Sequence, residues 1–431
     1  MASERSAPTP TIVIDARQPI DGRTGGIAWV TEGLVRGLLS LDPGPERYCI
    51  VGYAEQQPRL ASLVQDAAQL VINAPPRLRR IRGGLRDLLY RFPTLQRMRD
   101  SVQDRLIRAP ATTSGQRTDP TLDAIAGDLI HFPTQRFFPT RMPSVYNPHD
   151  LQHLHYPRFF TRNELVRRER LYRAGCTSAR RIAVSSGWIK RDLMAQYGIA
   201  ADKIQVIPWG IVQARPEFSQ LELTAARREI GLGEGEPFAL YPAATWAHKN
   251  HLRLLEALAL LRPRLRLKLV CCGHRNAFYP TIEHRSRDLE LADQVIFPGV
   301  LPRARLDALY AQASLVVIPT LFEASSALLR EAWRWQRPVA CAAVTSLPEQ
   351  AGDSALLFDP LRPDAIADAM ARVAQDKALR GRLIAAGQRR LARFTWERTA
   401  AAYRALYRSV LGTQLTDEDR ALLAHDWMTE L

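Results

Sequence analysis

Residues 314–331, which read SLVVIPTLFEASSALLRE, contain the pattern that decides the fold of this chain. The apolar, β-branched run at 314–319 predicts a buried strand, and the stretch at 326–335 predicts a helix that follows after a short loop. A strand, a loop and a helix start make a natural anion site, because the free N–H groups and the positive dipole end of the helix point at whatever lies above the sheet.

Two carboxylates in this stretch suit a hydroxyl-rich ligand. Glu323 lies in the loop, and Glu331 lies two turns further on, inside the helix. The first can bind hydroxyl groups, and the second can accept hydrogen bonds from another part of the same ligand. Either Glu alone would more often be a solvated helix residue. Together with the helix start they favour a sugar nucleotide diphosphate, with its phosphates at the helix tip.

Strands and helices alternate on both sides of this stretch. We expect strands at residues 11–15, 48–52, 69–73, 128–132, 144–146, 181–185 and 204–208 in the first half, and at 237–241, 267–271, 294–297, 315–318 and 339–341 in the second. Helices are expected between them, at 27–39, 163–174, 187–197, 251–261, 303–312, 326–335 and 364–373. This alternation predicts an α/β fold with two parallel sheets, each covered by helices on both faces.

The length of the chain predicts two domains, because 431 residues exceed the size at which one core keeps growing. Proline, glycine and polar residues cluster at 209–223 and mark the boundary. We expect a first domain at residues 1–212, with a basic insertion at about 75–122, and a second domain at 213–395. A final helix with aromatic residues is expected from Trp396 to Leu411, within the segment 396–431.

The composition is that of a globular cytoplasmic protein. Hydrophobic residues make up 46% of the chain, the N-terminus lacks the apolar core of a signal peptide, and no run is long enough to span a membrane. The five cysteines show no metal-ligand spacing, which indicates reduced structural thiols. No motif for nucleic-acid binding accompanies the net charge of +15, so a nucleic-acid partner is not expected.

Basic residues concentrate in one segment, residues 77–108, which holds ten arginines. Its apolar residues are spaced for an amphipathic helix, which Pro93 interrupts. Two interpretations have equal weight: the helix lies on an anionic membrane surface, or it packs on the first domain.

The motifs resemble those of the family 4 retaining glycosyltransferases. The resemblance rests on Glu323 and Glu331 with seven intervening residues, on Pro338-Val339, and on the segments 347–349 and 355–360. It covers nearly the whole chain except the insertion. It implies two Rossmann-like domains that face each other across a cleft, the GT-B fold, and a C-terminal helix in segment 396–431 that crosses back to the first domain. Ala324 and Gln336 stand where many relatives have Gly.

A second motif, at residues 241–257, reads YPAATWAHKNHLRLLEA and predicts a strand, a loop and a helix. Lys249 at the start of this helix can reach a β-phosphate and stabilise the charge that develops on a leaving group. Alone, it would more often be a surface lysine next to a capping Asn250. The resemblance assigns it the phosphate role, although Ala243 replaces an Arg that many relatives carry.

A third motif, at residues 146–157, ends a strand of the first domain with a His-Asp pair. His149 can donate a hydrogen bond to a sugar hydroxyl or a backbone oxygen, and Asp150 would fix its tautomer. We expect His153 and His155 to be structural and to pack against Tyr156.

The resemblance implies a site with residues from both domains. His149, Lys249 and Glu323 are the expected catalytic residues. The expected donor-binding residues are Gly25, Gly26, Thr245, His248, Lys249, Glu323, Ser325, Ser326, Ala327 and Glu331. No metal and no cofactor are expected, because the lysine and the helix dipole carry the charge.

The function that follows is retaining transfer of a hexose from a nucleotide-diphosphate sugar to a lipid-linked oligosaccharide or polysaccharide. The resemblance is closest to bacterial enzymes of surface-polysaccharide assembly, many of which use GDP-mannose. We expect a cytoplasmic protein, either free or peripheral on the inner face of the plasma membrane. The alternative is a catalytically silent nucleotide-sugar-binding or scaffold protein, for which the departures at Ala243 and Ala324 leave room.

Overall fold

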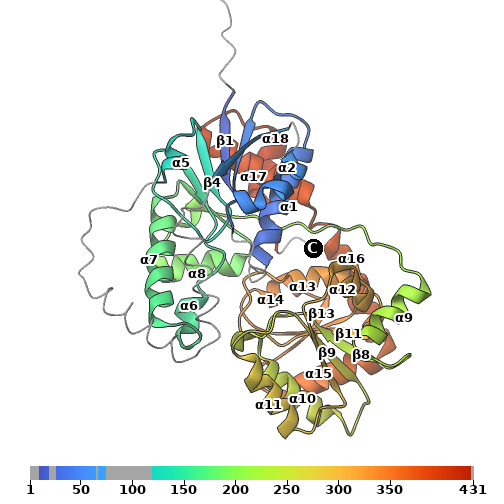
Figure 1. Cartoon of the computed structure of the whole chain (residues 1–431). Helices are drawn as coiled ribbons and strands as arrows, with labels where there is room; N and C mark the ends of the chain where they lie inside the picture. Colours follow the sequence, from blue (N-terminus) through green and yellow to red (C-terminus); the bar gives the residue numbers. More distant parts are fainter. Residues whose placement is uncertain (1–8, 19–25, 65–66, 74–118, 429–431) are drawn as a thin grey trace, which may run out of the picture. The chain divides into compact units, whose positions relative to one another are not determined.

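The computed structural model describes residues 9–18, 26–64, 67–73 and 119–428, and these residues form two compact units (Figure 1). Unit 1 comprises Met1–Ala183, Tyr197–Gln205 and Ala400–Leu423, and unit 2 comprises Val184–Gln196, Val206–Thr399 and Ala424–Leu431. Each unit is built on its own sheet of parallel strands, so the predicted α/β fold with two parallel sheets is confirmed.

The sheet of unit 1 has seven strands in the order β3-β2-β1-β4-β5-β6-β7. They are β1 (Thr11–Asp15), β2 (Arg47–Tyr53), β3 (Gln69–Asn73), β4 (Leu129–Phe132), β5 (Ser144–Tyr146), β6 (Arg181–Val184) and β7 (Ile204–Val206). The central strands β1 and β4 are buried on both faces, which explains their continuous apolar runs. All seven lie within two residues of their predicted positions.

The α-helices among the described residues up to position 200 are α1 (Gly26–Ser40), α2 (Gln57–Val64), α5 (Pro120–Asp123), α6 (Gln152–His155), α7 (Arg162–Ser178) and α8 (Gly187–Tyr197). A reciprocal pair of hydrogen bonds between Thr161 and Glu164 begins α7. In α2, α6 and α7 the buried face packs on a neighbouring strand or helix of the unit.

The last part of unit 1 comes from the end of the chain. Helix α17 (Trp396–Leu411) brings Tyr403 and Tyr407 to the sheet, and α18 (Asp417–Ala424) follows it (Figure 1). Thr416 and Asp419 exchange the hydrogen bonds of a capping box, and Asp419 is buried, 3.0 Å from Nη1 of Arg408.

Two buried tyrosines tie α17 to the strands of unit 1. The Tyr407 hydroxyl lies 2.7 Å from Nδ1 of His131, and Asn147 donates to the Tyr403 hydroxyl over 2.7 Å. Nε2 of His131 lies 3.0 Å from the Asn147 carbonyl oxygen, which only accepts, so Nε2 carries the proton. Burial lowers the pKa of His131 to about 3, so the ring is neutral and the network is fully paired.

The sheet of unit 2 has six strands in the order β10-β9-β8-β11-β12-β13. They are β8 (Phe238–Tyr241), β9 (Lys268–Cys272), β10 (Val295–Gly299), β11 (Leu315–Ile318), β12 (Val339–Ala342) and β13 (Ala355–Phe358). The last of these was not predicted. It is a short edge strand that reads ALLF, and its two central residues reach the surface although they are apolar.

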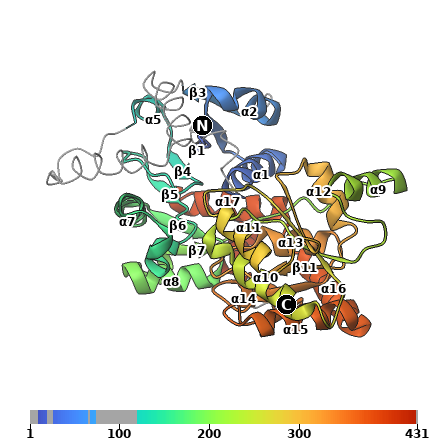
Figure 2. The same ribbon diagram turned by 60° about the horizontal axis from the view of Figure 1, so that its bottom comes forward.

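Helices cover the sheet of unit 2 on both faces. They are α9 (Gln220–Glu229), α10 (His251–Leu261), α11 (Tyr279–Asp288), α12 (Arg303–Tyr310), α13 (Ala327–Arg334), α14 (Leu347–Ala351), α15 (Pro363–Gln375) and α16 (Lys377–Leu391). Helix α10 packs against α15, and α13 packs against α16 (Figures 1 and 2).

The strand order creates one switch point in each sheet. In unit 1 the chain moves outward from β1 in one direction and from β4 in the other, and in unit 2 it does so from β8 and β11. The loops after two such strands diverge, which opens a crevice at the carboxyl ends of the strands. These crevices are where each unit can hold a ligand.

Candidate functional site

The switch point of unit 2 brings together two residues that the sequence analysis took from separate motifs. Lys249 follows β8 and Glu323 follows β11, and Nζ of the lysine lies 2.8 Å from Oε2 of the glutamate. Their side chains are 19% and 16% exposed. The pair therefore presents one cation and one carboxylate at the edge of the sheet, within reach of a ligand.

The loop that carries Lys249 is held by side chains around it. Asn250 adopts a left-handed conformation, with φ of 61°, and its amide donates to the carbonyls of Pro319 and Pro360 at 2.9 and 2.8 Å. The Tyr241 hydroxyl donates to the Lys249 carbonyl over 2.9 Å. Asn250 was considered as a helix cap, but its side chain instead ties the loop to the ends of β11 and β13.

The backbone of Glu323 is fixed from the neighbouring loop. Its N–H donates to the Thr345 hydroxyl over 3.0 Å, and its carbonyl accepts from the hydroxyls of Thr345 and Ser346 at 2.7 Å each. Sequence reasoning missed both residues. The only signal was their position just before the predicted turn at 347–349.

Helix α13 begins below this loop, as predicted. The Ser326 hydroxyl caps it by accepting from the N–H of Leu329, and Ala327 is its first residue. The N–H of Ser326, one of three expected to face phosphates, donates to Oε1 of Gln350 over 2.9 Å, and the Ser325 hydroxyl is 3.4 Å from the same oxygen. Gln350 thus shapes the helix start from α14, a role that the sequence did not indicate.

A buried cation lies under the same loop. Arg330 is 2% exposed, its guanidinium lies 4.8 Å from the centre of the Phe394 ring, and Nη1 donates to the Ser325 hydroxyl over 3.2 Å. Within the described part of the chain no carboxylate lies within ion-pair distance of it. Burial lowers the pKa of Arg330 to about 10, so the side chain stays charged near neutral pH and makes the potential at the loop more positive.

The second glutamate is also paired. Glu331 forms an ion pair with Arg303, the first residue of α12, which binds Asp307 at 2.7 Å as well. Arg303 was not singled out in the sequence. Since the Glu331 carboxylate keeps unshared acceptor positions, it can still accept hydrogen bonds from a ligand.

Thr245 and His248, two further predicted donor-binding residues, lie in the loop after β8. The Thr245 hydroxyl donates to the Asn276 side chain over 3.0 Å and accepts from the Asn276 N–H at 2.9 Å. The His248 carbonyl accepts from the N–H of Leu321 over 2.8 Å. Both residues therefore join the loop after β8 to its neighbours. Ala243, where many relatives have Arg, is buried in the same loop.

In unit 1, His149 lies in the loop after β5 with a left-handed backbone, φ of 65°. Nε2 of the buried ring lies 2.9 Å from the Pro133 carbonyl, which fixes the proton on that nitrogen. Burial lowers the pKa of His149, so Nδ1 is an acceptor rather than a donor near neutral pH. Asp150 accepts from the N–H of Gln152 over 3.0 Å. The His153 ring packs edge-on against Tyr172, where Tyr156 was expected.

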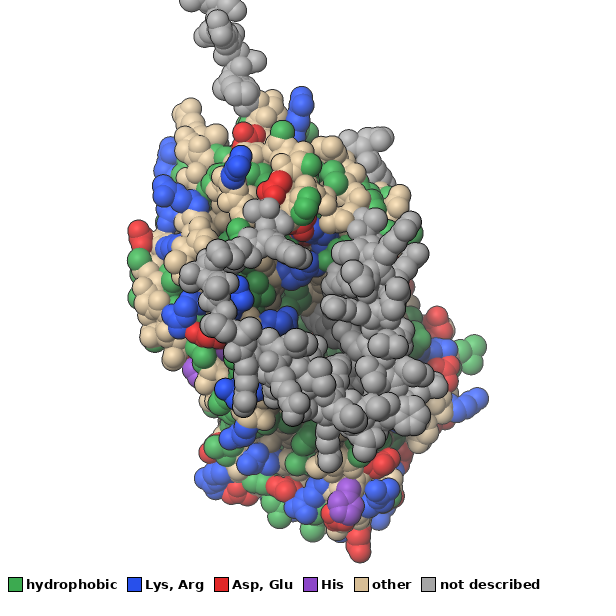
Figure 3. Space-filling view, turned by 60° about the vertical axis from the view of Figure 1, so that its left-hand side comes forward, with side chains coloured by type: hydrophobic (Ala, Val, Ile, Leu, Met, Phe, Trp, Pro, Cys, Tyr) green, Lys and Arg blue, Asp and Glu red, His purple; other side chains and the backbone are tan. Residues whose placement is uncertain are grey.

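Several predictions fall outside the described residues. Gly25 and the basic segment 77–108 belong to these, so the membrane hypothesis stays untested; Gly26 is the first residue of α1. Among the residues that the structure describes, no helix is both long and apolar enough for a membrane span, and no three His, Cys, Asp or Glu side chains cluster as metal ligands. All five cysteines are buried and free. Lys and Arg side chains are spread over the face drawn in Figure 3.

His251 predicts a pH dependence of stability. It is buried against Tyr241, neither ring nitrogen has a hydrogen-bond partner in the described structure, and burial lowers its pKa to about 3. The unfolded chain binds the proton near pH 6.5 and the folded chain only near 3, so stability falls by ~1.4 kcal/mol per pH unit as pH drops through this window. His251→Phe should recover about 2 kcal/mol of this loss at about pH 5.

Urea unfolding at about pH 7 and about pH 5 measures this effect. His284→Phe is the matched control, because that side chain is 73% exposed and should leave the pH dependence unchanged. An equal pH dependence in the wild type and His251→Phe would contradict the prediction.

Comparison with known proteins adds two family matches. Residues 224–390 match the model of glycosyl transferases group 1, and residues 116–215 match that of Glycosyltransferase Family 4. The chain is 27% identical to O-antigen chain mannosyltransferase B of Escherichia coli over 290 residues, which is 65% of this chain and 75% of that protein. It is 27% identical to D-inositol 3-phosphate glycosyltransferase of Corynebacterium glutamicum over 245 residues, but spans only 59% of that relative's length.

Solved structures show the same fold. Anabaena HepE in complex with UDP and glucose superposes with a TM-score of 0.66 at 16% identity, covering 93% of this chain and all of that one. WaaG, a glycosyltransferase involved in lipopolysaccharide biosynthesis, gives a TM-score of 0.58 at 16% identity, covering 89% of this chain and 95% of that one. At these sequence identities, what the chain shares with the two solved structures is the fold, an architecture of two Rossmann-like domains.

Proposed function

We propose that this chain, a glycosyltransferase of the GT-B type, is a retaining enzyme that moves a hexose from a nucleotide-diphosphate sugar to a glycan or lipid-linked glycan. The observation that carries the proposal is the pairing of Lys249 and Glu323 at the switch point of unit 2, above the start of α13. The cation and the helix N-terminus at this sheet edge suit the diphosphate of such a donor, and the carboxylate suits its sugar hydroxyls.

Each residue then has a role set by its surroundings. Lys249 would bind the β-phosphate and stabilise the charge that grows as the sugar leaves. Glu323, with its backbone fixed by Thr345 and Ser346, would bind sugar hydroxyls, and Glu331 would bind the ribose. His149 in unit 1 would accept a hydrogen bond from a sugar hydroxyl through Nδ1, because Nε2 already donates to Pro133.

Retention requires attack from the face that the leaving group vacates. Among the described residues no carboxylate is clearly placed as a nucleophile, and Glu323 is held in an ion pair with Lys249, so we propose departure and attack on the same face. Proton NMR of the first product formed would show the anomeric configuration. An inverted product would overturn this part of the proposal.

GDP-mannose is the proposed donor, supported by the mannosyltransferase among the relatives, whereas HepE was solved with UDP. Thermal-shift measurements against GDP, UDP and their sugars test this choice. A nucleotide at about 100 times its Kd stabilises a protein by ~2.7 kcal/mol, which raises the Tm by several degrees. GDP and GDP-mannose should give the largest shift, and Glu331→Ala should reduce it. A larger shift with UDP would reassign the base.

Transfer should persist in excess EDTA. Lys249 and the start of α13 supply positive charge at the proposed diphosphate position, and Arg330 adds to it from below. The measurement is the transfer rate in about 5 mM EDTA, compared with the rate after addition of manganese or magnesium. Loss of activity in EDTA with recovery on adding metal would contradict the prediction.

The second candidate function is binding of a nucleotide sugar without transfer. It is favoured by Ala243 and by Ala324, which replace residues common among relatives. Nucleotide-induced stabilisation without either transfer or hydrolysis of any donor would support it.

A further inference from the structure

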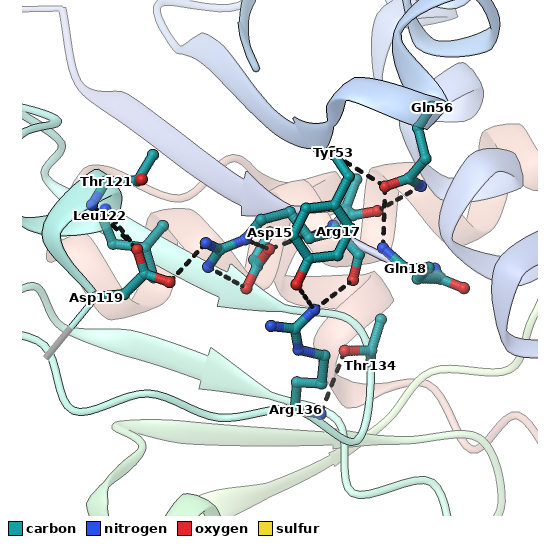
Figure 4. Close-up of polar contacts among 11 residues, drawn as sticks. Asp15, Arg17, Gln18, Tyr53, Gln56, Asp119, Thr121, Leu122, Thr134 and Arg136 are labelled. Atoms are coloured by element: carbon teal, nitrogen blue, oxygen red, sulfur yellow. Dashed lines mark hydrogen bonds and ion pairs between the residues drawn. The ribbon is translucent and has the colours of Figure 1, made fainter. Parts of the chain in front are cut away.

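The switch point of unit 1 carries a polar cluster of its own. The carboxyl ends of β1 and β4 diverge there, with the end of β2 beside them. We call it the Arg136 cluster. It comprises Asp15, Arg17, Tyr53, Asp119 and Arg136, which Figure 4 shows, together with Phe138. Neither the proposed donor site nor the sequence analysis uses any of these residues.

The positive charge of Arg17, the first arginine of the cluster, is balanced by carboxylates of the same unit. Arg17 is 1% exposed, and its guanidinium binds both oxygens of Asp15 at 2.6 and 2.9 Å and one oxygen of Asp119 at 2.5 Å. Two carboxylates thus neutralise one buried cation. This clamp fixes the chain after β1 and holds the Arg17 carbonyl towards Arg136, as Figure 4 shows.

Arg136, the second arginine, is held in place by hydrogen bonds, but no carboxylate among the described residues neutralises its charge. Nη1 of Arg136 donates to the Arg17 carbonyl over 3.2 Å and to the Tyr53 hydroxyl over 2.5 Å. The guanidinium lies 5.3 Å from the centre of the Tyr53 ring and 5.1 Å from that of Phe138. In the described part of the chain, no carboxylate is within ion-pair distance of Arg136, and nothing accepts from its Nε or Nη2.

This arrangement fixes the orientation of the Arg136 guanidinium group. One side of the guanidinium is used by protein acceptors, and two aromatic rings restrict its motion. The Nε–Nη2 edge is the geometry that binds a carboxylate or phosphate through two parallel hydrogen bonds. A half-buried cation in a crevice without a counter-charge is stabilised by such an anion.

We propose that the Arg136 cluster is a binding site for an anionic group, phosphate or carboxylate, on the acceptor. The inference rests on the proposed function, because it assigns the site to the acceptor of that transfer. It adds that the acceptor is charged, and that Arg136 selects it over a neutral glycan. The phosphate of a lipid-linked sugar and that of a soluble sugar phosphate share this chemistry.

Direct anion binding tests the proposal without requiring transfer. Calorimetric titration of the full chain with inorganic phosphate, farnesyl phosphate and glucuronate should show binding of at least one of them. Arg136→Gln should weaken it at least about tenfold, and Arg136→Lys, which keeps the charge but loses the fork, should weaken it less. Tighter binding of farnesyl phosphate than of inorganic phosphate would indicate a lipid-linked acceptor.

Two controls locate the site. Arg158 lies 5.4 and 5.1 Å from the ring centres of Tyr156 and Phe159 but is exposed, so Arg158→Gln should leave anion binding unchanged. Lys249→Ala removes the cation of the donor site, so the anion binding that remains in this variant reports the Arg136 site. The inference would be overturned if Lys249→Ala abolished anion binding while Arg136→Gln kept it. It would also be overturned if the wild-type protein bound none of the three anions.

The same titrations separate this inference from the proposed function. Nucleotide stabilisation should be equal in wild type and Arg136→Gln, because the donor site lies in unit 2. Nucleotide binding without anion binding would leave the proposed function intact and reject the Arg136 site. Absence of nucleotide binding and transfer would reject the proposed function itself.

Discussion

Replacing Lys249 with Ala is expected to lower the rate of sugar transfer by roughly 10²–10³-fold while the protein remains folded. The charge on the diphosphate grows as the sugar departs, so a cation beside it stabilises the transition state more than the bound donor. The main effect should therefore fall on kcat. The structure adds that Lys249 lies 2.8 Å from Glu323, so the variant also leaves that carboxylate without its ion-pair partner.

This contact makes the two residues a coupled pair. The losses in rate caused by Lys249→Ala and Glu323→Gln should not add in the double variant, because each single change already disrupts the same contact. Lys377→Ala is the matched control, since Lys377 is an exposed lysine at the start of α16 in the same unit. If the folded Lys249→Ala variant transferred sugar at a near-normal rate, the role of this lysine in stabilising the leaving group would be wrong.

Replacing Arg17 with Met should destabilise unit 1 by about 3–5 kcal/mol. The side chain is 1% exposed and separates two carboxylates, Asp15 and Asp119, that it binds directly. Without the guanidinium, two negative charges remain close together in a poorly solvated place. Thermal and urea unfolding of the variant would measure the loss.

The control for this prediction is the same substitution in an exposed ion pair. Arg59 binds Glu32 at 2.6 Å, but its side chain is 63% exposed, so Arg59→Met should cost less than about 1 kcal/mol. Equal losses in the two variants would show that burial does not set the strength of the Arg17 clamp. Adding Asp15→Asn to Arg17→Met should restore part of the stability, because it removes one unpaired charge.

Much of the fold could be predicted from local patterns. Helices α8, α10 and α17 and strand β11 begin and end at the predicted residues, because their apolar spacing and end signals lie within each segment. Helices α9, α11 and α16 were not predicted. They are short or highly charged, and they form because tertiary contacts favour them, as when α16 packs against α13 and α15.

The main residues of the candidate site could be predicted from the sequence, but the contacts between them could not. The motifs singled out Lys249, Glu323 and Glu331, yet the partners Arg303 and Gln350 carry no local signal. Which loops meet depends on the order of strands in the sheet, and a sequence pattern does not specify that order. The Arg136 cluster was missed for the same reason, since its members come from the ends of β1, β2 and β4 and from the start of α5.

Tyr403 and Tyr407 complete the core of unit 1 with residues that the ribosome adds late. Their buried partners Asn147 and His131 precede them by 256 and 276 residues, so at roughly 5–20 residues per second they wait tens of seconds for α17. Every strand of unit 2 is made within that interval, between Phe238 and Phe358. Completion of the two units during synthesis should therefore run against the order of translation: a nascent chain halted before residue 400 holds every strand of both sheets but lacks the helix that completes the core of unit 1.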